Sequence, residues 1–326
     1  MKVLVLEAKE VAASCKMRAC VDEMARAFAT VADGKSVSPQ RTRLALTEKR
    51  DILVMSSLVR RKEPEASFKV LSVIPDGGPG VTAIRAVVLL IDGSDGTTKA
   101  VLEGVALTGI RTGAVSGLSC RYLARKDSKV LGIIGAGTQA YYQVAGVHAA
   151  LKVEKVKIFS IDPGLSKGLA RRVGRDFGLE AEVVGTSAEC VRSSDVVVTA
   201  TTSSVPVFDG RDVSQGTHVI AMGSYRPTNR EVDSTFVSRA TIFVDSREAC
   251  LEEAGDLLIP ISEGVLGRDP IAAELAELVT GKKAGRKSND EITFFKCVGL
   301  AFEDNAAGWL AYRKAKAMGI GRTIEL

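Results

Sequence analysis

The chain has 326 residues, of which 46% are hydrophobic and 25% are charged, and its formal net charge is +5. This length is typical of about two domains, and the composition is that of an ordinary globular protein. The mild positive charge suits anionic cofactors and carboxylate substrates, but it is too small and too scattered for a nucleic-acid-binding protein. Because no apolar run approaches the roughly 18 residues of a membrane span, we expect no membrane partner.

The six cysteines are scattered along the chain and include no C-x-x-C pair. The N-terminus is typical of a short strand rather than of a signal peptide. Together these features predict reduced, mostly buried thiols in a cytoplasmic protein. His148 and His218 lie near no cysteine or carboxylate pair, so we expect no metal site.

The first third of the chain mixes helix and strand patterns. Apolar residues recur at helical spacing over residues 15–33, which predicts an amphipathic helix. Strand patterns follow at Ser67–Val73, Thr82–Ile91 and Thr98–Leu102, and the turn Asp92–Gly96 joins the last two. We therefore predict a mixed sheet with a helix across it.

From residue 129 onward, strands and helices alternate. After a helix over 105–125, we predict strands at Val130–Ile134, Val156–Ser160, Glu180–Val184, Asp195–Ala200, His218–Ala221 and Thr241–Asp245, with helices ending near Leu151 and at Leu165–Phe177 and Ala188–Ser193. Such alternation favours a parallel, doubly wound sheet. A long amphipathic helix is predicted at Phe294–Ala315, and we expect it to return to the first domain.

A glycine motif follows the strand at 130–134. Gly135, Gly137 and Ala140 have the G-x-G-x-x-G/A spacing, and the order of strand, glycine turn and helix predicts dinucleotide binding. Gly135 permits the sharp turn, and Gly137 lets the backbone approach a pyrophosphate. The helix that begins near Thr138 and Gln139 offers backbone N–H groups to the phosphates.

The end of the next strand bears on the choice between NAD and NADP. In NAD-binding folds an acidic residue there holds the ribose hydroxyls, but the strand-end residue is Ser160, and Asp162 comes two residues later. Ser160 can accept a 2′-phosphate, with Lys167 or Arg171 one or two helical turns away. Asp162 favours NAD, or simply begins the next helix. Taken together, these residues slightly favour NADP over NAD.

Two loops follow later strands of the same predicted sheet, and loops at the carboxyl ends of such strands line the cofactor crevice. In the first loop we expect cofactor contacts from Ala200, Thr201 and Thr202. In the second we expect Met222, Gly223 and Ser224 to face the nicotinamide.

Three cations in the first part of the chain are candidate ligands for a substrate. Lys69 stands inside an otherwise apolar strand, where a lysine is costly unless it is paired or functional; the alternative is an edge-strand lysine facing water. Arg111 and Thr112 lie in a glycine-flanked helix opening that suits anion capture, or else a surface helix cap. Arg41 lies in a loop before a strand and alone indicates little.

Together these features resemble the ornithine cyclodeaminase/mu-crystallin family over nearly the whole chain. The resemblance is carried by Pro39–Arg41, Met55, Lys69, Leu107–Ala114, Gly135–Ala140, Thr199–Ser203, Met222–Ser224 and Ile292–Gly299. The family includes ornithine and lysine cyclodeaminases, archaeal alanine dehydrogenases, ketimine or Δ1-pyrroline-2-carboxylate reductases, opine-type dehydrogenases, and mu-crystallins that bind NADPH and thyroid hormone.

The resemblance implies an α/β fold with a Rossmann-type nucleotide-binding domain, residues 119–296. This domain would be inserted in a mixed α+β substrate and dimerisation domain, residues 1–118 and 297–326, which implies a homodimer. By match to the family, Arg41 and Arg111 would grip the substrate carboxylate, and Lys69 would stabilise the imine or relay a proton. Thr112 would touch the cofactor phosphates, and Val298 and Gly299 would lie against the nicotinamide.

One departure from the family bears on the reaction. Where ornithine cyclodeaminases carry an Asp that handles the distal amine, this chain has Tyr225. A second ammonium needs a carboxylate partner, so the departure weakens the ornithine interpretation. It also weakens the alanine dehydrogenase interpretation, because those members resemble the pattern that carries the Asp.

We therefore predict NAD(P)H-dependent reduction of a cyclic imine carboxylate, Δ1-pyrroline-2-carboxylate or Δ1-piperideine-2-carboxylate. Tyr225 would pack against the substrate ring or donate a hydrogen bond to it, or would only pack its own loop. The alternatives are an amino-acid dehydrogenase of alanine or opine type, an ornithine cyclodeaminase that recycles its NAD, and a mu-crystallin-like NADPH-dependent binding protein.

Overall fold

The computed structural model describes residues 1–326 except 49 and 75–83. The chain divides into two compact units, one formed by Met1–Thr112 and Gly299–Leu326 and the other by Gly113–Val298. The first division falls within helix α3 (Gly104–Leu123), and the second falls in the short segment between a strand and the last helix. The sequence places these divisions after residues 118 and 296.

The first unit is built on an eight-stranded sheet in the order β16-β1-β7-β6-β5-β4-β2, with β3 pairing β4 off this path. The strands are β1 (Lys2–Leu6), β2 (Ser36–Val37), β3 (Thr42–Ala45), β4 (Asp51–Val59), β5 (Glu65–Val73), β6 (Ile84–Asp92), β7 (Thr98–Glu103) and β16 (Arg322–Glu325). Strands β4 to β7 are antiparallel neighbours, whereas β1 is parallel to β7, so the predicted mixed sheet is confirmed. Residues 82 and 83 of the predicted strand Thr82–Ile91 lie outside the described residues.

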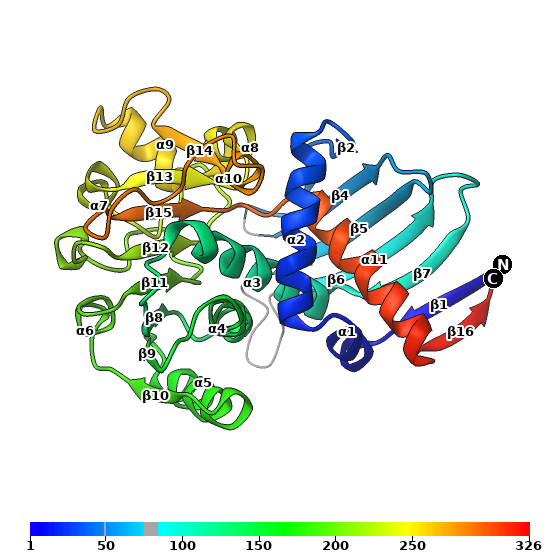
Figure 1. Ribbon diagram of the computed structural model, residues 1–326, viewed down its shortest axis with the longest axis horizontal. Helices are drawn as coiled ribbons and strands as arrows, with labels where there is room; N and C mark the ends of the chain where they lie inside the picture. The colour runs from blue at the N-terminus through cyan, green and yellow to red at the C-terminus, as the bar shows by residue number, and fades with distance from the viewer. Residues whose placement is uncertain (49, 75–83) are drawn as a thin grey trace. The chain divides into compact units, whose positions relative to one another are not determined.

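Helices cover one face of this sheet. They are α1 (Ala8–Ser14), α2 (Met17–Ala32) and α11 (Ala301–Met318). Helix α11 packs against β4, β5 and β6 on one side and against α1 and α2 on another (Figure 1). This position explains why α11 is buried over most of its length, including polar residues that a surface helix would expose to water.

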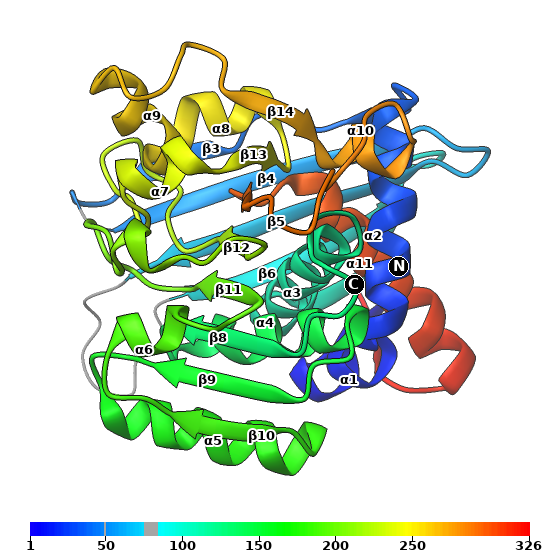
Figure 2. The same ribbon diagram turned by 60° about the vertical axis from the view of Figure 1, so that its left-hand side comes forward.

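The second unit is built on an eight-stranded sheet in the order β10-β9-β8-β11-β12-β15-β13-β14 (Figure 2). Its strands are β8 (Val130–Ile134), β9 (Lys155–Phe159), β10 (Glu180–Val183), β11 (Val196–Thr199), β12 (His218–Ala221), β13 (Thr241–Val244), β14 (Ile271–Glu274) and β15 (Thr293–Lys296). Every pair in this order is parallel, as predicted. The helices are α4 (Thr138–Ala150), α5 (Pro163–Phe177), α6 (Ser187–Val191), α7 (Ser234–Arg239), α8 (Arg247–Glu253), α9 (Gly255–Ser262) and α10 (Leu275–Val279), with a 3-10 turn at Gly210–Asp212.

The predicted helix Phe294–Ala315 is wrong at its start. Phe294 and its neighbours form β15, an inner strand between β12 and β13, and helix α11 begins only at Ala301. A strand buried on both faces of a parallel sheet is continuously apolar, so its pattern cannot be told from that of a buried helix. Gly299 separates the two elements with a φ of 77°.

All six cysteines are buried and free, which confirms the prediction of reduced thiols. Among the described residues, no group of three or more His, Cys, Asp or Glu side chains is arranged to hold a metal ion. Within the same residues, no helix is long and apolar enough to cross a membrane.

Candidate active site

Lys69 lies on β5, an inner strand of the first sheet, and its side chain is buried. Its Nζ atom donates a hydrogen bond of 2.6 Å to Asp304 Oδ2. Asp304 belongs to α11, the helix that packs on this sheet. The alternative of an edge-strand lysine facing water is therefore wrong, because the strand is central and the ammonium is paired inside the unit.

Arg111 shares the same carboxylate. It lies in α3, and its Nε donates to Asp304 Oδ1 at 3.1 Å while its Nη1 donates to Glu303 Oε2 at 2.6 Å. Its side chain is only 7% exposed, so the alternative of a surface helix cap is wrong. Asp304 thus bridges Lys69 and Arg111.

Arg41 reaches the same region through the backbone. It precedes β3, and its Nη2 donates to the carbonyl oxygen of Gly299 at 2.8 Å. Gly299 has a φ of 77°, which favours glycine, and a Cβ there would lie 2.6 Å from Arg111 Nη1. The structure therefore brings together Arg41, Lys69 and Arg111, which the sequence predicts separately.

The surroundings of this cluster change the acidity of Lys69. Burial lowers the pKa of Lys69 to about 8, the Asp304 carboxylate opposes that shift, and the Arg111 and Arg41 charges add to it. Burial would raise the pKa of Asp304, but Arg111 and Lys69 outweigh it and hold that pKa below its usual range. A lysine with a pKa near physiological pH can hold a proton and release it, as a general acid requires.

The glycine motif lies at the carboxyl edge of the second sheet. Gly135 has a φ of 101°, and a Cβ there would lie 2.5 Å from the carbonyl oxygen of Ala200, so the turn requires glycine. Strands β9 and β11 flank β8 on opposite sides, which makes this edge a topological switch point, where nucleotides bind in such sheets. Helix α4 begins at Thr138 after Gly137, and no side chain in the described part of the chain caps it. Its first N–H groups thus fit a pyrophosphate, beside Gln139.

The residues after β9 form a helix cap. Asp162 Oδ1 accepts hydrogen bonds from Gly164 N at 2.8 Å and Leu165 N at 3.1 Å, at the start of α5. Ser160 Oγ accepts from Asp162 N at 3.2 Å. The interpretation of Asp162 as a helix start is therefore confirmed, and Ser160 stands at the strand end where a ribose is recognised in this fold.

Other predicted site residues have contacts within the chain that do not indicate which ligand they would bind. Thr112 Oγ1 donates to the carbonyl oxygen of Thr108 at 2.7 Å, within α3. The Tyr225 ring is partly buried against the apolar core of the second unit, as loop packing requires. Val298 N donates to Asp245 Oδ2 at 2.8 Å, which fixes the segment before Gly299. Thr202 and Met222 lie in the loops after β11 and β12.

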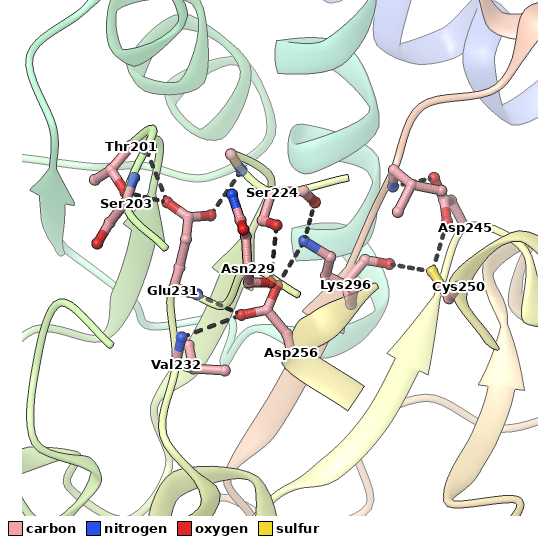
Figure 3. A network of polar contacts seen from close by, with 12 residues as sticks. Thr201, Ser203, Ser224, Asn229, Glu231, Val232, Asp245, Cys250, Asp256 and Lys296 are labelled. Carbon is pink, nitrogen blue, oxygen red and sulfur yellow. Dashed lines mark hydrogen bonds and ion pairs between the residues drawn. The ribbon is translucent and has the colours of Figure 1, made fainter. Parts of the chain in front are cut away.

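Sequence reasoning missed three charged residues that lie behind these two loops. Glu231, Asp256 and Lys296 are fully buried, and Lys296 Nζ forms an ion pair of 2.8 Å with Asp256 Oδ2 (Figure 3). Lys296 carries the same signal that marks Lys69, a lysine inside an apolar strand, and could have been found by it. Glu303 and Asp304 were also missed, because they appear as polar residues of an amphipathic helix.

Comparison with known proteins agrees with this geometry. The model of the ornithine cyclodeaminase/mu-crystallin family matches residues 1–319. The chain belongs to the ornithine cyclodeaminase/mu-crystallin family. It is 36% identical over 326 residues to the Δ1-pyrroline-2-carboxylate reductase of Bacillus cereus, covering 99% of this chain and 100% of that protein.

Solved structures of this family share the fold. The Δ1-pyrroline-2-carboxylate reductase of Thermococcus litoralis, in complex with NADH and L-proline, matches 99% of this chain and 100% of that chain with a TM-score of 0.96 and 38% identity. An archaeal alanine dehydrogenase dimer with bound NAD matches 100% of both chains with a TM-score of 0.92 and 31% identity. The family and the α/β fold class predicted from the sequence are thereby confirmed.

Proposed function

We propose that this member of the family is an NAD(P)H-dependent reductase that converts a cyclic imine carboxylate, Δ1-pyrroline-2-carboxylate or Δ1-piperideine-2-carboxylate, to the cyclic amino acid. The observation that carries the proposal is the buried cluster in which Lys69 and Arg111 share Asp304 and Arg41 binds the adjoining backbone. The likeness to Δ1-pyrroline-2-carboxylate reductases over the full length of the chain supports the substrate class.

Each cation in the cluster has a role in this reaction. The guanidinium groups of Arg41 and Arg111 bind the substrate carboxylate, because planar N–H pairs match its two oxygens. Their grip orients the imine carbon for attack. Lys69 holds at Nζ the proton that the imine nitrogen takes up, and Asp304 keeps that ammonium in place. Tyr225 lies in the loop after β12 and would either pack against the substrate ring or donate a hydrogen bond to it.

The dinucleotide, when bound, supplies the hydride that the imine carbon accepts. Gly135, Gly137 and the first N–H groups of α4 would hold its pyrophosphate, and Ser160 would contact the ribose. Because Ser160 carries no charge, it would not repel a 2′-phosphate, whereas a carboxylate at the strand end would. We therefore propose that the chain uses NADH or NADPH, with a preference for NADPH.

We further propose a homodimer in the cytoplasm. The face of the first sheet opposite α11 exposes three large apolar side chains, Phe68, Val70 and Val87, each 37–40% exposed. Phe68 and Val70 alternate on β5 with the buried Ser67 and Lys69, and Val70 pairs with Val87 on β6. An apolar sheet face is suited to burial against a second copy of the chain. The six free cysteines support a reducing compartment.

One assay distinguishes the reaction from its relatives. Oxidation of NADPH and of NADH is measured with each of the two imine carboxylates, and in parallel ornithine is supplied with catalytic NAD, and pyruvate with ammonia. We expect rapid oxidation with an imine and none with pyruvate and ammonia. Proline formed from ornithine without net change in NADH identifies a cyclodeaminase instead, and cofactor binding without any turnover identifies a binding protein.

A further inference from the structure

A single carboxylate joins the loops that follow β11 and β12. Glu231 Oε1 accepts from Thr201 N at 2.7 Å and from Thr201 Oγ1 at 2.8 Å, while Oε2 accepts from Gly223 N at 2.6 Å (Figure 3). The ladder between the two strands ends at the pair Thr199 and Ala221. Beyond it, Glu231 links the loops in place of backbone pairing.

Two more buried charges hold Glu231 from behind. Asp256, in the first turn of α9, accepts at Oδ1 from Glu231 N at 2.6 Å and from Val232 N at 3.1 Å. Its other oxygen pairs with Lys296 Nζ, which also donates to the carbonyl oxygen of Ser224 at 2.6 Å. The network therefore contacts the loop after β12 twice, at Gly223 through Glu231 and at Ser224 through Lys296.

The loops are also packed backbone to backbone. A Cβ at Gly223 would lie 2.1 Å from the carbonyl oxygen of Thr201 and 2.6 Å from Glu231 Oε1. On the other side, Gly135 of the dinucleotide motif packs against Ala200, next to Thr201. The second loop therefore packs closely on the first loop, and the first loop packs closely on the glycine turn.

A stable fold does not require charges at this place. Burying two carboxylates and an ammonium costs free energy that apolar side chains of similar volume would not cost. Burial raises the pKa of Glu231, and Lys296 opposes that rise. What the charges provide, and apolar packing does not, is one defined geometry for the hydrogen-bonded groups.

We propose that Glu231 is a positioning residue for dinucleotide binding, and that Asp256 and Lys296 hold it in place. By joining Thr201 to Gly223, it fixes the two loops on which the nicotinamide end of the cofactor would lie. This inference rests on the reductase function proposed above, and it assigns Glu231 no contact with substrate.

The test uses Glu231→Gln in the full-length chain. The amide keeps the volume of the side chain, but its NH2 group must face either Gly223 N or Thr201 N, so one link between donor and acceptor becomes a conflict between two donors. Asp256→Asn is the milder variant, because its amide conflicts only with Lys296. It replaces Glu231→Gln if that protein does not fold.

Asp195→Asn provides a matched control at the opposite edge of the same sheet. Asp195 Oδ2 accepts from Lys129 N at 2.8 Å and Val130 N at 2.9 Å, and Oδ1 pairs with Arg125. It therefore fastens the amino ends of β8 and β11 with the same kind of contacts. This substitution costs stability without touching the loops at the carboxyl edge.

Two readouts are compared between the variants, each measured at the same interval below the Tm of that variant. In the cofactor-free protein, hydrogen exchange should quicken in peptides containing Thr201 and Gly223 for Glu231→Gln, but not for Asp195→Asn. The Kd for NADH and NADPH, measured by fluorescence, should rise about tenfold for Glu231→Gln, the effect of one lost hydrogen bond. For Asp195→Asn it should stay within about twofold.

Three outcomes overturn the inference: an unchanged Kd and exchange in Glu231→Gln, an equal loss of affinity in Asp195→Asn, or a wild-type chain that binds no dinucleotide. A wild-type chain that binds the dinucleotide but reduces no imine refutes the proposed reaction and leaves the positioning role of Glu231 supported by exchange and Kd.

Discussion

Asp304 holds the charged ends of Lys69 and Arg111 at the same time, with one oxygen 2.6 Å from Lys69 Nζ and the other 3.1 Å from Arg111 Nε. A strand and a helix from the first part of the chain are thereby tied to the last helix. The contact fixes the direction of both cations before any substrate arrives, and such preorganisation favours the transition state without a cost at the moment of reaction.

Removing the ammonium of Lys69 should slow turnover strongly while the dinucleotide still binds. We expect Lys69→Met to lower kcat by about 10²- to 10⁴-fold, the usual contribution of a general acid. Steady-state kinetics with the imine carboxylate measure kcat, and fluorescence titration with NADPH checks binding. Lys99→Met removes a lysine from the outer ion pair with Asp92 and serves as the control. A kcat near that of the wild type in Lys69→Met would refute the proposed role.

The pH profile should depend on Asp304. Burial lowers the pKa of Lys69 to about 8, and Asp304 raises it by favouring the charged form. If protonated Lys69 is needed, kcat/KM falls as the pH rises above about 8. Asp304→Asn removes the opposing charge, so this alkaline limb should move to lower pH by about one unit or more. A profile that keeps its midpoint while its height falls would mean that Asp304 acts on structure alone.

The sequence predicts what local patterns encode. The glycine turn at Gly135, the order of strands and helices after it and the parallel sheet all follow from periodicity and spacing, because each lies within a short stretch of chain. Lys69 is also visible, since a charge in an apolar strand is rare enough to need a reason.

Partners distant in the chain were not predictable in the same way. Asp304 is 235 positions from Lys69 and 193 from Arg111, and no local signal links them. The strand β15 was mistaken for helix because it is short and buried on both faces, so it shows no alternation of polar and apolar residues. A lysine inside this strand is visible in the sequence, but the pairing of Lys296 with Asp256 on α9 became visible only once the fold placed both residues.

The residue at the end of β9 should set the choice of dinucleotide. Ser160→Asp places a carboxylate where a 2′-phosphate would bind, and like charges repel, whereas the ribose hydroxyls of NADH can donate to it. We expect the ratio of kcat/KM for NADPH over NADH to fall about tenfold or more. Ser238→Asp, at an exposed serine of α7, serves as the control. Ser166 is not suitable for this purpose, because it is buried in α5. Equal ratios in Ser160→Asp and the wild type would place the recognition elsewhere.

The exposed face of the first sheet should mediate self-association. Val70→Glu places a charge among the apolar side chains of β5 and β6, and burying an unpaired carboxylate in a contact is unfavourable. We expect the wild type to be dimeric by light scattering and this variant to be monomeric. Val183→Glu alters a similarly exposed valine on β10 of the other unit and should leave the mass unchanged. A dimeric Val70→Glu protein would exclude this face.

Acid should destabilise the second unit through His218. Burial, helped by the Arg286 charge, lowers the pKa of His218 to about 3. The ring lies 3.2 Å from Ser119 Oγ and 2.9 Å from Thr293 Oγ1, in a buried network that joins α3, β12 and β15.

In the unfolded chain this histidine takes up a proton near pH 6.5, whereas the folded chain resists until about pH 3. The unfolded state therefore binds more protons between these values, and stability is lost as the pH falls, by about 1.4 kcal/mol per pH unit from this one group. Calorimetry from neutral to acidic pH should show a steeper fall in Tm for the wild type than for His218→Gln, even if the variant begins lower. His148→Gln, at a half-buried histidine, controls for the other imidazole. Parallel curves of Tm against pH for the wild type and His218→Gln would show that His218 does not drive the acid transition.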